Sequence, residues 1–158
     1  MQSSLDSQEA HGHGEIQSAL KAFSSEQGAS GREPAGKAGW DLTWLWDQAG
    51  YLEGTAYPTH RGNSALTAHV VLSDGTPGPF ARLQDLRWGD RIIVRAFGQV
   101  YSYEVRTVQR VNAGDLRSLG HKEQAWLTLI TCHTYDEAGG RYLHRMVVQA
   151  VLVEVADG

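Results

Sequence analysis

Residues 125–155 read AWLTLITCHTYDEAGGRYLHRMVVQAVLVEV, and this stretch decides the class of fold. Two segments rich in apolar and β-branched residues, 125–132 and 141–155, flank the turn-forming residues HTYDEAGG. β-Branched and aromatic residues favour strands, whereas Gly and Asp favour turns. We therefore predict that these segments are the last two strands of the chain, linked by residues 133–140.

Side chains alternate between the two faces of a strand, so spacing predicts which residues lie together. In segment 125–132, Thr128 and Ile130 share a face with Cys132, which ends the predicted strand. In the final segment Arg145 and Gln149 belong to the face opposite the apolar one. That apolar face comprises Met146, Val148, Ala150 and Leu152.

Short apolar segments also precede this pair. Residues 64–72, 91–96 and 100–111 read as further strands separated by turn residues, and the spacing within residues 80–89 predicts one short helix ended by Gly89. Helical periods are otherwise scarce, and the β-α-β alternation of a parallel sheet is missing from the sequence. We predict a mainly β fold, a closed or nearly closed barrel of about six strands with one or two short helices.

The first part of the chain has a different character. Residues 1–38 are rich in Ser, Gly, Gln, Glu and Ala, which predicts a flexible or atypical segment with one isolated short helix over 16–23. We predict that residues 39–158 form the folded domain. No sequence of about 18 apolar residues that could span a bilayer is present, and the first residues lack the pattern of a secretory signal.

Composition limits the classes of function. The 158 residues are enough for one domain with a core, and a net charge of −4 without a basic cluster argues against nucleic acid binding. The single cysteine, Cys132, excludes an internal disulfide and a cysteine-based zinc site. A lone thiol is either a buried structural residue, the common case, or a reactive group near positive charge.

Two further residues are candidates for chemistry. His69 lies in SALTAHVV, where a polar ring in an apolar strand is either a hydrogen-bonded core residue or a proton carrier. Arg145 is either a solvated arginine on an outer strand face or a fixed cation that stabilises an oxyanion. A cysteine, a histidine and a cation are the ingredients of acyl transfer, but spacing alone does not bring them together.

The motifs that contain these residues resemble those of sortases. Residues 128–132, TLITC, resemble the family signature that ends in the nucleophile, and Arg145 follows just before an apolar final strand. Residues 66–69, LTAH, preceded by GNS, resemble the histidine segment, although Ala68 stands where many sortases have glycine. FARL followed by WGD, within 80–90, also fits. The resemblance covers about residues 44–155.

The resemblance implies a cysteine transpeptidase of the bacterial cell surface. Cys132 would attack a carbonyl of an LPxTG-like sorting signal, His69 would move protons and Arg145 would bind the oxyanion. Thr67, Thr128 and Ile130 occupy positions that line the family's substrate face. The implied partners are the sorting-signal peptide of a surface protein and an amine acceptor, either a cell-wall precursor or a pilin lysine. No metal or organic cofactor is implied, and Asp115 and Glu123 alone give little support for a calcium site in their loop.

Several alternatives stay open at the level of sequence. Sortases usually begin with a membrane anchor and an apolar first strand, and neither is visible here, so a barrel lacking its first strand is one alternative. A degenerate barrel that binds a peptide or partner without transpeptidation is a second. A hydrolase, in which water resolves the thioester, is a third. The sortase class is also left open by the motifs.

Overall fold

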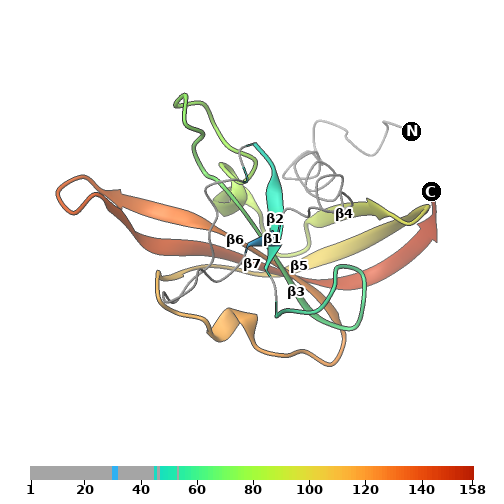
Figure 1. The fold of residues 1–158 in the computed structure, drawn as a ribbon. Coiled ribbons are helices and arrows are strands. Elements are labelled where there is room, and N and C mark those ends of the chain that lie inside the picture. The colour runs from blue at the N-terminus through green and yellow to red at the C-terminus, as the bar shows by residue number, and fades with distance from the viewer. Residues whose placement is uncertain (1–29, 32–44, 46, 53) are drawn as a thin grey trace.

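The computed structural model describes residues 30–31, 45, 47–52 and 54–158. The helix predicted over 16–23 lies outside these residues. The described residues form one sheet of seven strands in the order β1-β2-β3-β6-β7-β5-β4, and Figure 1 shows that this sheet is curled. The strands are β1 (Ser30–Gly31), β2 (Ala49–Leu52), β3 (Gly62–Ala68), β4 (Arg91–Ala96), β5 (Gln99–Asn112), β6 (Ala125–Asp136) and β7 (Arg141–Asp157). The predicted mainly β architecture is confirmed.

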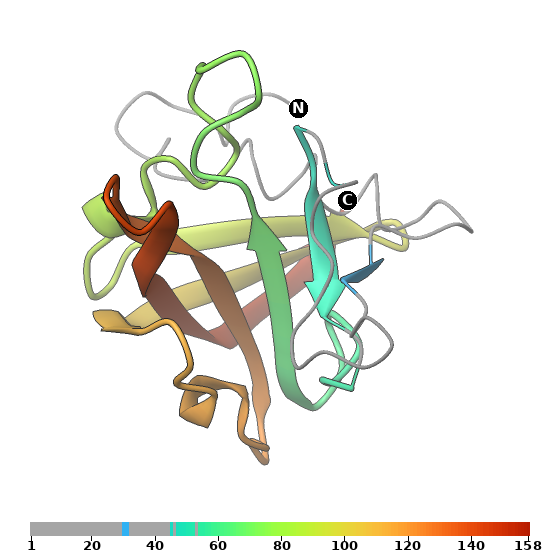
Figure 2. The same ribbon diagram turned by 60° about the vertical axis from the view of Figure 1, so that its left-hand side comes forward.

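The sheet curls into a half-barrel with β1 and β4 at its edges, as Figure 2 shows from the side. Neighbouring strands are antiparallel except for the pairs β1–β2 and β3–β6. Inside the curve lies the apolar core, which includes Leu66, Leu129 and Val148, each at most 1% exposed. These side chains come from β3, β6 and β7, so burial of one face holds together the three strands that carry the candidate site.

The short helix predicted within residues 80–89 is present as a 3-10 helix rather than an α-helix. The structure has one short 3-10 helix there, η3 (Leu83–Asp85), and a second, η4 (Arg117–Leu119), between β5 and β6. Phe80, Leu83 and Leu86 are spaced by three residues, and all three are buried. A period of three matches the turn of a 3-10 helix, so one such turn buries all three side chains without an α-helix.

The final hairpin is longer than predicted, and Cys132 therefore does not end its strand. Pairing continues past Cys132 through His133–His144 and Tyr135–Tyr142 to Asp136–Arg141, which shortens the link to residues 137–140. The prediction is wrong because residues 133–136 pair with β7 despite the local preference of this segment for a turn, and cross-strand pairing overrides such a weak preference. The extended hairpin of β6 and β7 projects away from the sheet in Figure 1.

Candidate active site

Cys132 and Arg145 are directly opposite each other on neighbouring strands. The antiparallel register of β6 and β7 pairs them, and paired residues present their side chains on one face, with Cβ atoms about 4.5–5.5 Å apart. Both side chains are half-buried. The arginine thus places a fixed positive charge beside the only thiol of the chain.

The pKa of Cys132 reflects two opposed influences. Burial raises the pKa of the thiol above its ordinary value, and the nearby charge of Arg145 lowers it, with burial the larger effect. The thiol is therefore mainly protonated at neutral pH. Thiolate formation needs either a higher pH or a neighbouring base.

This balance predicts the pH dependence of thiol alkylation. Because the thiolate is the reactive form, the alkylation rate of Cys132 by iodoacetamide should rise with a midpoint above the value of about 8.5 typical of free cysteine. Arg145→Gln should move the midpoint further upward, since removing the cation disfavours the thiolate. Mass spectrometry of samples quenched between pH 6 and 11 measures the rate. A midpoint that falls in Arg145→Gln would contradict the electrostatic assignment.

His69 follows β3 immediately and lies level with Cys132 along the chain direction. Strands β3 and β6 are parallel, and Thr67 pairs with Ile130. His69 and Cys132 each lie two residues beyond this pair. One residue before each of these positions, the Thr131 hydroxyl donates a hydrogen bond to the Ala68 carbonyl at 2.8 Å, which links the ends of the two segments. The half-buried His69 is therefore held at the same end of the sheet as the thiol.

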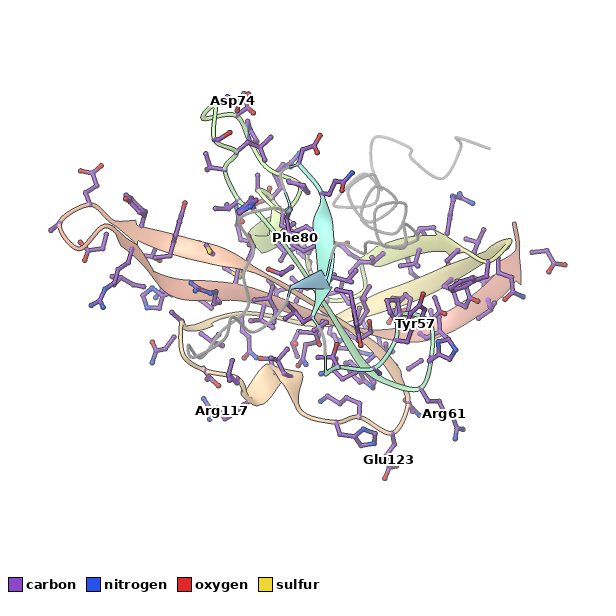
Figure 3. The ribbon with its side chains drawn as sticks, viewed as in Figure 1. Tyr57, Arg61, Asp74, Phe80, Arg117 and Glu123 are labelled. Carbon is purple, nitrogen blue, oxygen red and sulfur yellow. The ribbon has the colours of Figure 1, made fainter. Side chains whose placement is uncertain are left out.

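The prediction that His69 lies inside a strand is wrong, and the reason is a loop that binds its backbone. The strand ends at Ala68. The carbonyl of His69 then accepts a hydrogen bond from the Phe80 amide at 3.3 Å, and that of Val70 accepts one from the Gly78 amide at 2.9 Å. Buried Phe80, labelled in Figure 3, anchors the end of this loop in the core. The loop thus takes the place of a neighbouring strand.

Gly78 is a position where only glycine fits. A Cβ atom there would lie 2.1 Å from the carbonyl oxygen of His69, which is backbone and cannot simply rotate away. We predict that Gly78→Ala displaces the His69 backbone and lowers the free energy of unfolding by about 1–3 kcal/mol. Urea denaturation measures this change. Gly114→Ala is the matched control, since a Cβ there meets nothing within 4 Å; equal stability of the two variants would contradict the prediction.

The three predicted substrate-contacting residues differ in their surroundings. Ile130 is half-buried, one alternation step from Cys132. Thr67 is 4% exposed and its hydroxyl donates to the Ile130 carbonyl at 2.9 Å. Thr128 is fully buried and hydrogen-bonded to Asn63. Ile130 therefore offers side-chain surface to a ligand, while both threonine hydroxyls already have protein partners.

Sequence reasoning missed the polar residues around this site. Gln149 of β7 donates to the Thr128 hydroxyl at 3.2 Å. Asn63 belongs to the GNS segment before the histidine motif, and residue spacing predicts no contact between it and β6. Among the described residues, no group of three or more His, Cys, Asp or Glu is arranged to bind a metal ion. In the same part of the chain we find no helix with the length and apolar character of a membrane span.

Comparison with known proteins identifies the family. Residues 32–153 match the model of the sortase domain, and the chain belongs to the sortase family, as the motifs predicted. Sortase A from Corynebacterium diphtheriae (lid mutant) is 30% identical with a TM-score of 0.63, over 73% of this chain and 61% of that one. Sortase C-1 from Actinomyces oris is 33% identical with a TM-score of 0.61, over 73% and 64% of the two chains.

A sortase D5 from Clostridium perfringens has the same fold at 23% identity and a TM-score of 0.59, over 73% of this chain and 68% of that one. The chain thus spans about three fifths of the length of the sortase A and C structures above. A comparison with curated protein sequences found no match.

Proposed function

We propose that this protein is a cysteine transpeptidase that cleaves an LPxTG-like sorting signal and joins it to an amine at the bacterial cell surface. The observation that carries the proposal is the direct pairing of Cys132 with Arg145 in a chain of the sortase family. Acyl transfer needs a nucleophile beside a group that stabilises the developing oxyanion, and this pair supplies both.

The proposed reaction has two steps. The Cys132 thiolate forms a bond to the carbonyl carbon of the scissile peptide bond, the C–N bond breaks, and His69 gives its proton to the leaving amine. An incoming primary amine then loses a proton to His69 and attacks the thioester, which restores the thiol. Arg145 donates hydrogen bonds to the tetrahedral oxyanion in both steps. Burial keeps the thiol mainly protonated, so a minority thiolate–imidazolium pair starts the reaction.

The acceptor is proposed as either a cell-wall precursor amine or a pilin lysine. A pilin has a specific precedent, because the structure of sortase C from Streptococcus pneumoniae, 27% identical over 67% of this chain, bears on pilin substrate specificity. We propose that Ile130 contacts the peptide directly and that the buried Thr67 and Thr128 support this surface from beneath. For the two threonines this role is steric, since their hydroxyls have protein partners.

The test is a peptide-library cleavage assay with and without an added amine. Purified protein is incubated with LPxTG-like peptides, and mass spectrometry follows the cleaved acid, the thioester on Cys132 and the amide formed with oligoglycine or a lysine peptide. Ligated amide supports transpeptidation. Acid alone would make the protein a hydrolase, and no thioester with any peptide would favour a barrel that only binds.

A further inference from the structure

Three buried polar side chains lie on the face of the sheet that carries the candidate site. Asn63, Thr128 and Gln149 are 3%, 0% and 8% exposed. Thr128 pairs with Gln149 across β6 and β7, and β3, which carries Asn63, is the other neighbour of β6. Because side chains alternate, Thr128 shares the face of Cys132 and Gln149 that of Arg145. We call these three residues the polar clamp.

The three side chains of the polar clamp are hydrogen-bonded to one another, and two of them also donate to backbone carbonyls of a loop. The Gln149 amide donates to the Thr128 hydroxyl at 3.2 Å, and that hydroxyl donates to Oδ1 of Asn63 at 2.5 Å. Since Oδ1 of Asn63 accepts this bond, its Nδ2 faces the other way. It donates to the carbonyls of Ser118 at 2.7 Å and Gly120 at 3.0 Å. Nε2 of Gln149 also donates to the Ser118 carbonyl, at 3.1 Å.

Ser118 and Gly120 belong to the loop of residues 113–124, which carries η4 between β5 and β6. Figure 3 marks this loop by Arg117 and Glu123. A buried amide without a hydrogen-bond partner is costly, so Asn63 and Gln149 favour one position of the loop over others. The loop is also braced internally, because the Arg117 guanidinium binds the Asp115 carboxylate at 2.6 Å and holds the pKa of that carboxyl at about 2.

The polar clamp is separated from the reacting atoms by one layer of side chains. Thr128 and Cys132 are four residues apart on β6, which is about 13 Å along a strand. Between them, Ile130 pairs with Val147 of β7. A peptide whose carbonyl reaches Cys132 while its chain lies over Ile130 therefore runs toward the loop that the polar clamp holds.

We propose that Asn63 and Gln149 are positioning residues, which fix the loop of residues 113–124 as a wall of the peptide-binding face without touching the reacting atoms. This inference rests on the proposed function for its effect on the peptide. Its effect on the loop itself follows from the hydrogen bonds alone. Loss of the polar clamp should therefore weaken peptide binding while leaving the chemistry of Cys132 intact.

The experiment compares Asn63→Asp, Asn63→Ala and Gln149→Leu with the unaltered protein. Asn63→Asp keeps the size of the side chain but replaces the donor that faces two carbonyls by an acceptor. All three should exchange amide hydrogens faster within residues 113–124, raise KM for a cleavable peptide about tenfold or more, and change kcat less than about threefold. The alkylation rate of Cys132 by iodoacetamide should be unchanged, because this small reagent reacts with the thiol without contacting residues 113–124.

Ser64→Ala is the matched control. Ser64 adjoins Asn63 on β3, is fully buried, and its hydroxyl has no hydrogen-bond partner among the described residues. It faces the core rather than the loop, so this variant should show unaltered exchange and KM. Gln149→Leu, an apolar side chain of similar size, keeps the test valid if the Asn63 variants fail to fold.

Unchanged exchange in residues 113–124 of Gln149→Leu would overturn the inference, as would a fall in kcat and in alkylation rate equal to the rise in KM. A failure of the proposed function is distinguishable. If the unaltered protein forms no thioester, the proposed reaction is wrong, and the exchange measurement still decides whether the polar clamp holds the loop.

Discussion

Cys132→Ala should abolish formation of the acyl-enzyme with any LPxTG-like peptide, a loss of about 10⁴-fold or more in turnover. The chain has no second thiol that could replace it. A methyl group cannot attack a carbonyl, and the neighbouring Arg145 is a cation without nucleophilic character. Intact-mass spectrometry after mixing with peptide detects the thioester as an adduct, and amide product formation gives the turnover.

The substitution should leave the fold intact, which makes the result interpretable. Cys132 is half-buried on the face opposite the apolar core, so removing its sulfur leaves the packing of Leu129 and Val148 unchanged. A urea midpoint close to that of the unaltered protein is the control. Cleavage of the peptide by Cys132→Ala at a normal rate would show that another group performs the reaction.

Arg145→Lys should lower kcat about 10²–10³-fold, equivalent to about 2.7–4 kcal/mol of lost transition-state stabilisation. Lysine keeps the positive charge but lacks the planar, forked donors of a guanidinium. The pH midpoint of Cys132 alkylation should therefore stay close to that of the unaltered protein, although peptide turnover falls. Single-turnover kinetics with a sorting peptide measures the loss.

This pair of readouts separates two roles of Arg145. The effect of Arg145 on the pKa of Cys132 comes from its positive charge, which Arg145→Lys keeps and Arg145→Gln removes. The two variants should therefore differ in alkylation, but both should be impaired in acyl transfer. Arg91→Lys is the control, because Arg91 lies on the edge strand β4 beside Glu104, at 3.7 Å, and should turn over normally. Full activity of Arg145→Lys would remove the oxyanion role.

Much of the strand content follows from local pattern. Arg91–Ala96 is β4 as predicted, and 100–111 falls within β5. Alternation also assigns Met146 and Val148 correctly to the buried core. The errors lie where tertiary contacts override local preference. Strand β6 runs past Cys132 because β7 continues to pair with it, and β3 stops before His69 because a loop takes over the hydrogen bonds of the backbone.

Residue types and spacing are sufficient to predict the class of fold, the family motifs and the candidate residues Cys132, His69 and Arg145. These depend on residue types and on spacing within single segments, which a sequence displays directly. Three features depend on the folded arrangement of strands and loops. Cys132 lies opposite Arg145, His69 lies at the same end of the sheet as the thiol, and Asn63 and Gln149 hydrogen-bond the loop of residues 113–124. Strand register is set by cross-strand packing and by loop hydrogen bonds between residues far apart in the chain, so no local pattern specifies it.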